Sequence, residues 1–348
     1  MNKKENRKIR LKDIAELAGV SASTASMVFS GTGRISSQIR EKVLQTARDY
    51  GYVHKTREKR TPAGKTSVAV LLSIDSEWSF IWHFLIDFFK ETERLLSLKS
   101  INTVIIPVSE NDSEVQIFRK IINSGSRAVF SIHTGNEKLF EHLESEGIPV
   151  IVVLNNNYQD KFFSICVDDF QGAYEGTKYL IKLGHKRIGF VDSLREGLPI
   201  LSTDRYYGYV KALEESGINV PADKKLFINP GHDTESLEHS VKKFLSTENP
   251  PSAFFALDDE IALRFRSVLL HLGYSVPDDI SIIAAGDVLD YSKPYTPAFT
   301  TMRIDMTYVG RLAVEMLFNR LNNPDLGTVH VLKVKQQLVE RNSCRSLS

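Results

Sequence analysis

Cysteine is scarce in this chain, and long apolar runs are absent. The two cysteines, Cys166 and Cys344, form neither a disulfide framework nor a metal-binding spacing, which fits a reducing compartment. The longest apolar run, residues 148–154, has seven residues, whereas a membrane-spanning helix needs ~20. Charged residues follow the basic N-terminus, so we predict no signal peptide. These absences predict a cytoplasmic protein that does not enter a membrane.

Net charge is also nearly absent, because the formal value is +1. This value conceals a division along the chain. Residues 1–66 hold 15 Lys and Arg against 6 Asp and Glu, a charge of +9, and the rest of the chain carries −8. Such an asymmetry indicates a polyanion-binding arm on an acidic body, although a solvated basic tail would give the same counts.

No catalytic constellation is visible. The nine histidines are scattered, and none forms the His-x-x-x-His pair of a zinc enzyme. Gly31 and Gly33 lack the preceding strand, the following helix and the Gly-Lys-Ser/Thr ending of a phosphate-binding loop. We interpret His185 as a helix-end cap. The sequence therefore predicts no enzymatic activity, no metal and no cofactor.

The hydrophobic pattern divides the chain into a helical head and an α/β body. Residues 10–52 contain three short helical stretches, with Gly19 ending the first and Ser21 as the expected N-cap of the second. Residues 54–66 are basic, lack an apolar face and contain proline and glycine, so they predict a linker.

From residue 67 onward, short β-rich runs alternate with amphipathic helical segments. The expected strands are 68–72, 103–108, 128–132, 150–154, 187–191, 226–228, 253–257 and 280–284. Such alternation gives parallel sheets covered by helices on both faces. The number of strands exceeds what one open sheet usually holds, so we expect two α/β lobes. Ligands in such folds bind at the carboxyl ends of strands, which makes the cleft between the lobes the natural site.

The segment 11–30 has the layout of a helix-turn-helix, with a first helix, a tight glycine turn and a short second helix. This layout lets the second helix enter a major groove while the first crosses the backbone. The second helix carries small hydroxyl side chains, which suit phosphate and base-edge contacts. A plain helical hairpin is the alternative, but the charge of +9 on residues 1–66 favours DNA.

Motifs along almost the whole chain carry a resemblance to a known family. They are Asp13-Ile-Ala, Ala18-Gly-Val-Ser, Thr24-Ala-Ser, Arg40-Glu-Lys-Val and Tyr50-Gly-Tyr in the head, and Gly184-His-Lys-Arg-Ile-Gly, Arg205-Tyr-Tyr-Gly-Tyr, Val276-Pro-Asp-Asp-Ile-Ser, Pro297-Ala-Phe-Thr-Thr and Leu338-Val-Glu-Arg in the body. In this order they resemble the LacI/GalR family of bacterial transcription regulators. The resemblance implies a homodimeric repressor that reads a pseudo-palindromic operator. It also implies a periplasmic-binding-protein-like core whose lobes close on a small, sugar-like effector.

The resemblance and the composition together define three parts: an all-α helix-turn-helix head, a basic hinge, and an α/β core of two doubly wound parallel sheets. The core is expected to bind the effector and to dimerise. The predicted bounds are 9–53 for the head, 54–66 for the hinge and 67–340 for the core, with the first lobe at about 67–167 and 304–326 and the second at about 168–303 and 328–340.

Three positions of the second helix, Ala22, Ser23 and Met27, match the base-reading positions of the family. Family members often carry long polar side chains there. Because Ala22 and Met27 offer only apolar surface, we expect thymine-methyl contact rather than bidentate reading of guanine. Ser21, Thr24 and Ser26 are expected to contact phosphates or to act as caps, and for Ser26 a purely structural role fits equally well.

The hinge departs from the family pattern. Relatives commonly have a short hinge helix whose leucines wedge into the central minor groove. This chain has no leucine there and has Pro62 near the wedge position, and proline resists a helix interior. We predict weak central kinking, with a disordered tether as the alternative. The side chains expected to hold the DNA backbone are Lys55, Arg57, Lys59 and Arg60.

Effector contacts are also implied by the resemblance. Arg205 matches a family arginine that binds ligand oxygens through its planar fork, with a structural ion pair as the alternative. Asp258 replaces a family asparagine, and Asp287 matches the second of two family aspartates, because Gly286 stands at the first. The other candidates are Trp78, Phe80, Trp82, Asn155 and Asp169. The aromatic residues fit a core equally well, and Asp169 fits a helix cap.

Two classes of function remain after these observations. The first is a ligand-responsive DNA-binding repressor, in which an effector shifts the population between two arrangements of the heads. Within this class, the changes at Asp258 and Gly286 leave open a sensor that answers to a protein partner. The second is a cytoplasmic solute-binding or sugar-processing protein with an incidental helical head. The helix-turn-helix spacing, the charge of +9 and the absence of a signal peptide favour the first.

Overall fold

The computed structural model describes residues 10–30, 35–50, 66–73, 81–109, 111–193, 199–220, 225–228, 234–323 and 328–347. The chain forms two compact units, residues 1–64 and 65–348. The predicted hinge, 54–66, lies outside the described residues except for Thr66.

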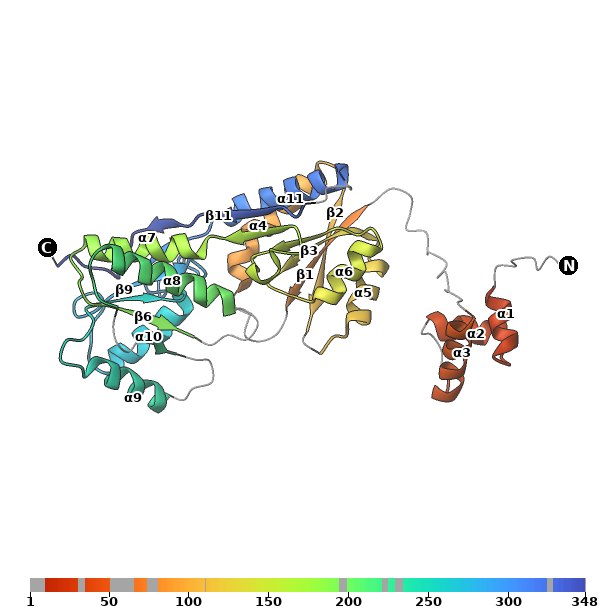
Figure 1. Ribbon diagram of the computed structural model, residues 1–348, viewed down its shortest axis with the longest axis horizontal. Coiled ribbons are helices and arrows are strands. Elements are labelled where there is room, and N and C mark those ends of the chain that lie inside the picture. Colours follow the sequence, from red (N-terminus) through yellow and green to blue (C-terminus); the bar gives the residue numbers. More distant parts are fainter. Residues whose placement is uncertain are drawn as a thin grey trace. The chain divides into compact units, whose positions relative to one another are not determined.

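The head consists of three helices, α1 (Leu11–Leu17), α2 (Ala22–Ser30) and α3 (Ser37–Asp49) (Figure 1). Gly19 has a φ of +69° in the turn between α1 and α2, a conformation that glycine adopts without steric cost. The predicted helix-turn-helix is therefore confirmed. The buried residues of its small core are Ile14, Ala15, Ala18, Ala25, Val28, Val43 and Ala47.

The first lobe of the body is built on a six-stranded parallel sheet. Its order is β11 (Val331–Val334), β5 (Ser164–Val167), β4 (Val150–Val153), β3 (Ser126–Ile132), β1 (Ser67–Ser73) and β2 (Asn102–Val108). The central strands β1 and β4 are almost continuously apolar and buried, as expected for a sheet covered on both faces.

The second lobe is built on another six-stranded sheet. Its order is β12 (Gln337–Val339), β10 (Thr300–Arg303), β9 (Ser281–Gly286), β8 (Ala253–Ala256), β6 (Ile188–Asp192) and β7 (Leu226–Phe227). All pairings are parallel except that of β12 with β10, which is antiparallel. The predicted pair of doubly wound sheets is confirmed, with one antiparallel edge strand.

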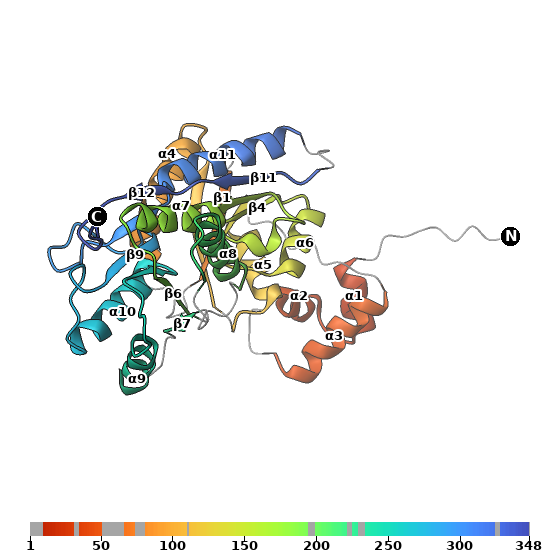
Figure 2. The ribbon, with the colours of Figure 1, turned by 60° about the vertical axis from the view of Figure 1, so that its left-hand side comes forward.

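Helices cover both faces of each sheet. On the first, α4 (Ile81–Ser97) and α11 (Met306–Asn322) lie side by side over one face (Figures 1 and 2), and α5 (Glu114–Asn123) and α6 (Glu137–Ser145) cover the other. On the second, α7 (Asp169–Lys182) packs against α8 (Pro199–Glu215), opposite α9 (Thr234–Leu245) and α10 (Asp259–His271). No helix in the described ranges is long and apolar enough to cross a membrane.

The last crossing between the lobes corrects one predicted boundary. The segment 328–340 was expected to belong wholly to the second lobe. Instead, β11 pairs with β5 in the first sheet, and only β12 joins the second. An apolar strand pattern shows that a segment is a strand, but its pairing partner depends on long-range packing. The chain therefore passes from one lobe to the other between Val334 and Gln337.

Candidate DNA interface and effector site

The second helix of the head exposes two small side chains in its first turn. Ala22 and Ser23 are exposed, Met27 is half-buried, and Ala25 and Val28 face the core. This alternation follows from helical periodicity, which turns every third or fourth residue inward. A surface of this kind lets the helix backbone approach a base pair closely.

Ser21 acts as the N-cap of α2. Its Oγ accepts a hydrogen bond from the backbone N of Thr24 at 3.1 Å and lies 2.8 Å from both the Ser23 Oγ and the Thr24 Oγ1. Capping of this type satisfies one of the free N–H groups at the start of a helix. Of the two roles predicted for Ser21, the structure therefore shows the cap, and its hydroxyl is already engaged with Thr24.

Several predicted site residues lie outside the described residues. They are Lys55, Arg57, Lys59 and Arg60 of the hinge, with Trp78 and Phe80 of the first lobe. Trp82 is described: it lies in the first turn of α4, is 43% exposed, and its ring stacks on Phe89 at 6.2 Å between centroids. Trp82 is thus a surface residue of α4 rather than part of the buried core.

Arg205 is held in a buried ion pair. Its Nε donates to Asp169 Oδ1 at 2.8 Å, its Nη2 lies 2.7 Å from the same oxygen, and its Nη1 donates to the carbonyl of Leu257. Arg205 is 4% exposed and Asp169 is 2% exposed. Since Asp168 caps α7, Asp169 is not the cap. The ion pair that we kept as the alternative for Arg205 is present. It occupies two of the five N–H groups of the guanidinium, and the Leu257 carbonyl accepts from a third.

Asn155 and Asp258 both serve as N-caps. Asn155 accepts from Asn157 N at 3.1 Å at the start of the short 3-10 helix η2 (Asn156–Tyr158). Asp258 accepts from Ile261 N at 2.9 Å at the start of α10. Each residue ends a buried strand segment, so the carboxyl edges of both sheets carry capped helix starts, as expected for this fold.

Asp287 belongs to a cluster of charges on the second sheet. Its Oδ1 accepts from Thr301 Oγ1 at 2.6 Å and lies 2.8 Å from Arg341 Nη2, and its Oδ2 pairs with Arg303. Two arginines and a hydroxyl thus surround both carboxylate oxygens. This arrangement gives Asp287 a structural role in joining β9, β10 and the C-terminal segment.

Comparison with known proteins identifies the family. Residues 10–54 match the model of bacterial regulatory proteins of the lacI family, and residues 177–344 match that of the periplasmic binding protein-like domain. The HTH-type transcriptional regulator AglR of Rhizobium meliloti (strain 1021) is 30% identical over 328 residues, which cover 91% of this chain and 89% of AglR. The chain belongs to the LacI family.

Further relatives and structures agree with LacI-family membership. The probable HTH-type transcriptional repressor ExuR of Bacillus subtilis (strain 168) is 25% identical, and the match covers 98% of this chain and 99% of ExuR. A transcriptional regulator CelR–cellobiose complex has a TM-score of 0.67 at 21% identity, covering 97% and 100% of the two chains. The lac repressor dimer bound to operator has a TM-score of 0.63 at 19% identity, covering 98% and 100%. This LacI-family chain is a DNA-binding transcription regulator.

Sequence reasoning overlooked one buried acid of this LacI-family core. Asp259 is fully buried, and its Oδ2 accepts from Val288 N (2.9 Å), Leu289 N (3.0 Å) and Tyr291 Oη (2.9 Å). Its Oδ1 has no hydrogen-bond partner in the described part of the chain. The adjacent acids Asp258 and Asp259 were the available signal, but only the first was singled out because it followed the strand directly.

Asp259 should make this LacI-family core more stable at mildly acid pH. Burial raises its pKa to about 6 from an ordinary 3.8, so the folded state holds this proton more tightly than the unfolded state. The stabilisation is fully present below about pH 4 and is lost as the pH rises through about 6. We expect Asp259→Asn to remove this dependence, up to about 3 kcal/mol between pH 4 and 7.5.

Urea unfolding of the wild type and of Asp259→Asn at several pH values measures this effect as the difference between the two curves. Asp279→Asn is a matched control, because the pKa of the exposed Asp279 is lowered, chiefly by hydrogen bonds from Ser275. Because the lowered pKa and the ordinary value of 3.8 both lie below this range, the difference between Asp279→Asn and the wild type should stay nearly constant between pH 4 and 7.5. Parallel pH curves for the wild type and Asp259→Asn would contradict the prediction.

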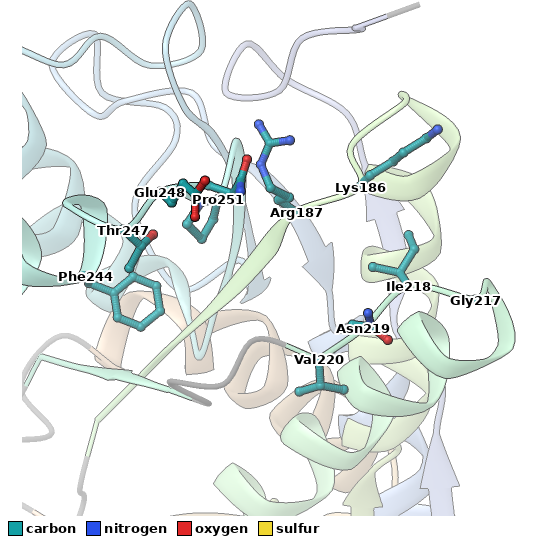
Figure 3. Close-up of a pocket in the computed structure, with 11 residues that line it drawn as sticks. Lys186, Arg187, Gly217, Ile218, Asn219, Val220, Phe244, Thr247, Glu248 and Pro251 are labelled. Atoms are coloured by element: carbon teal, nitrogen blue, oxygen red, sulfur yellow. The ribbon is translucent and has the colours of Figure 1, made fainter.

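A cavity of about 630 Å³ lies at the amino ends of strands β6 and β8 of the second sheet (Figure 3). Lys186 and Arg187 line it at the start of β6, with Ile218 and Val220 on one side and Phe244 on the other. None of the predicted effector residues that the structure describes lines it. The candidate effector residues Arg205 and Asp258 lie instead near the carboxyl ends of the strands, the usual ligand edge of such sheets.

Proposed function

We propose that this regulator is a repressor that binds a pseudo-palindromic operator as a homodimer in the cytoplasm. We propose further that a small sugar-like or polyol effector, bound between the two lobes, controls this binding and that the chain is not an enzyme. The combination of a helix-turn-helix head and a two-lobed core in one chain carries the proposal. Such an architecture lets an effector that prefers one lobe angle change the population of DNA-binding heads.

Names and structures of relatives support this proposal. ExuR is named a probable transcriptional repressor, the lac repressor structure is a dimer on operator, and the CelR structure holds cellobiose. Arg205 and Asp258 are the effector contacts that we propose in the second lobe, with Trp82 and Asn155 in the first. Since Asp169 and the Leu257 carbonyl together occupy three N–H groups of Arg205, an effector would use at most the two that remain.

Operator selection from random duplex tests the proposal directly. A selected pseudo-palindrome confirms dimeric, sequence-specific binding, and fluorescence anisotropy with D-ribose, D-glucose, sucrose and cellobiose then tests control by a sugar. A protein that enriches no sequence would contradict the repressor assignment. Enrichment with no response to any of the four sugars would contradict the sugar-like effector for this set.

Met27→Arg should change the sequence that is selected. Ala22, Ser23 and Met27 are the base-reading positions that we propose, and an arginine at residue 27 would add a bidentate donor for guanine. We expect G·C enrichment at one position of each half-site, with a discrimination of about 1–3 kcal/mol. Gln38→Arg adds the same charge at an exposed position of α3 and should leave the preference unchanged. An identical preference for Met27→Arg and the wild type would disprove base reading at residue 27.

A further inference from the structure

Two of the connections between the lobes lie against each other at the start of α7. One leads from β5 into α7, and the other leads from β11 to β12 through Gln336. The backbone N of Asp168 donates to the carbonyl of Val334 at 2.9 Å. The two connections are therefore bonded together where the chain leaves the first lobe.

The side-chain amide of Gln171 bonds to both the backbone N–H and the carbonyl of Gln336. The Gln336 N–H donates to Gln171 Oε1 at 2.9 Å, and Gln171 Nε2 donates to the Gln336 carbonyl at 3.3 Å. Paired bonds of this kind replace the sheet partners that a residue between two strands lacks. The side chain of Gln336 is consequently fixed in one direction, toward the first turn of α7.

The amide of Gln336 reaches the buried ion pair. Its Nε2 donates to Asp169 Oδ1 at 3.3 Å, the same oxygen that accepts from Arg205, and Asn156 of the first lobe donates to Asp169 Oδ2 at 3.4 Å. Gln336 is 3% exposed and Asn156 is 7% exposed. Asp169 therefore joins a residue from each lobe and a residue from the connection between them.

Two further observations show that this position is built for a polar side chain. A Cβ on Gly172 would lie 2.4 Å from the Gln336 Cδ, so only glycine leaves room for the amide. The Gln336 Oε1 is buried and has no hydrogen-bond partner in the ranges that the structure describes. An unpaired buried oxygen costs stability, and a leucine would avoid that cost. The benefit of glutamine must therefore come from its Nε2, which bonds to Asp169.

We propose that Gln336 is a positioning residue that fixes the angle between the lobes by linking their last connection to the Asp169–Arg205 pair. This role rests on the proposed function insofar as Arg205 contacts the effector: a change at Arg205 would then reach the connection through Asp169 and Gln336. Gln336 itself does not contact the effector. Replacing the Gln336 amide lets the angle between the lobes vary without unfolding either lobe.

Distances between spin labels in the two lobes test this role without operator or effector. The labels are placed on Lys99→Cys, after α4, and Lys242→Cys, on α9, which are both exposed. Burial raises the pKa of the Cys166 and Cys344 thiols to about 12, so these thiols label poorly at neutral pH, and the chain without added cysteines gives the background. Loss of a hydrogen bond to a charged group changes the ratio between two conformations about tenfold.

Labelled chains are mixed with an excess of unlabelled chains, so that the distance is measured within one protomer of the proposed homodimer. We expect one dominant distance in the wild type. Gln336→Leu should change the ratio of minor to major distances about tenfold, while the melting temperature stays the same or rises because an unpaired oxygen is removed. Gly172→Ala displaces the same amide and should act similarly. Gln337→Leu changes the exposed neighbouring glutamine and should have no effect.

An unchanged distance distribution in Gln336→Leu would overturn the proposal, whether or not the protein is less stable. So would equal broadening in Gln337→Leu. If Gln336→Leu does not fold, the Gly172→Ala distribution decides in the same way. Because the measurement needs neither DNA nor sugar, its failure is distinguishable from a failure of operator selection or of effector response.

Discussion

Operator affinity will fall by roughly 10³–10⁵ between 50 and 200 mM salt if each dimer makes the six to ten phosphate contacts typical of such proteins. The physical reason is the release of counterions from the DNA backbone when lysine and arginine neutralise phosphates. We expect the head and hinge region to supply these cations, because residues 1–66 carry +9 while the rest of the chain carries −8. Fluorescence anisotropy on a selected operator at a series of salt concentrations gives the slope.

Charge-removing variants locate the source of this salt dependence. We propose that Arg57 of the hinge contacts a phosphate; Arg57→Gln then removes one contact from each protomer of the dimer and should reduce the slope by about 2. Lys182→Gln removes the same charge from the last turn of α7 in the body and should leave the slope unchanged. A flat salt response of the wild type would contradict the DNA-binding role of the head, and an equal effect of Lys182→Gln would contradict the assignment to the hinge.

Asp169→Ala should lower the free energy of unfolding of the body by about 3–5 kcal/mol. The substitution leaves the Arg205 guanidinium buried, with the Leu257 carbonyl as its remaining partner in the described chain. An uncompensated buried charge is far more costly than the ion pair itself. Urea unfolding followed by circular dichroism measures the loss.

Two controls make the result for Asp169→Ala interpretable. Lys211→Ala breaks the exposed pair with Glu215 on the same helix as Arg205 and should change stability by less than about 1 kcal/mol. The double variant Asp169→Leu with Arg205→Met removes both charges and should recover most of the loss. If Asp169→Ala were no more destabilising than Lys211→Ala, the buried pair would not be the main support of this junction.

The sequence predicted the architecture well because its signals were long and local. All eight expected strands are present within one to two residues of their predicted ends, from β1 at Ser67–Ser73 to β9 at Ser281–Gly286. Four strands were not predicted: β5, β10, β11 and β12. Each has three or four residues, and most of them lie near a sheet edge or carry polar residues. Such short runs are recognised as strands only through their partners.

The candidate site was harder to predict than the fold. Ser21 was predicted as either a cap or a phosphate contact, and Asp258 only as an effector contact. The bonds from Thr24 N and Ile261 N show that both residues are caps. Arg205 was found through its motif, but its pairing with Asp169 depends on the packing of α8 against α7. Gln336 gave no signal at all, because an isolated glutamine between two short strands has no characteristic pattern.

The crossing between β11 and β12 has a consequence for synthesis of the protein. A chain that leaves the ribosome from its N-terminus folds domain by domain where each domain is a continuous segment. Here β11 (Val331–Val334) completes the first sheet and β12 (Gln337–Val339) the second, and only two residues separate the two strands. Neither lobe can complete its sheet before residues 331–339 have left the ribosome. A nascent chain stalled near residue 330 should therefore expose the edges of β5 and β10 together.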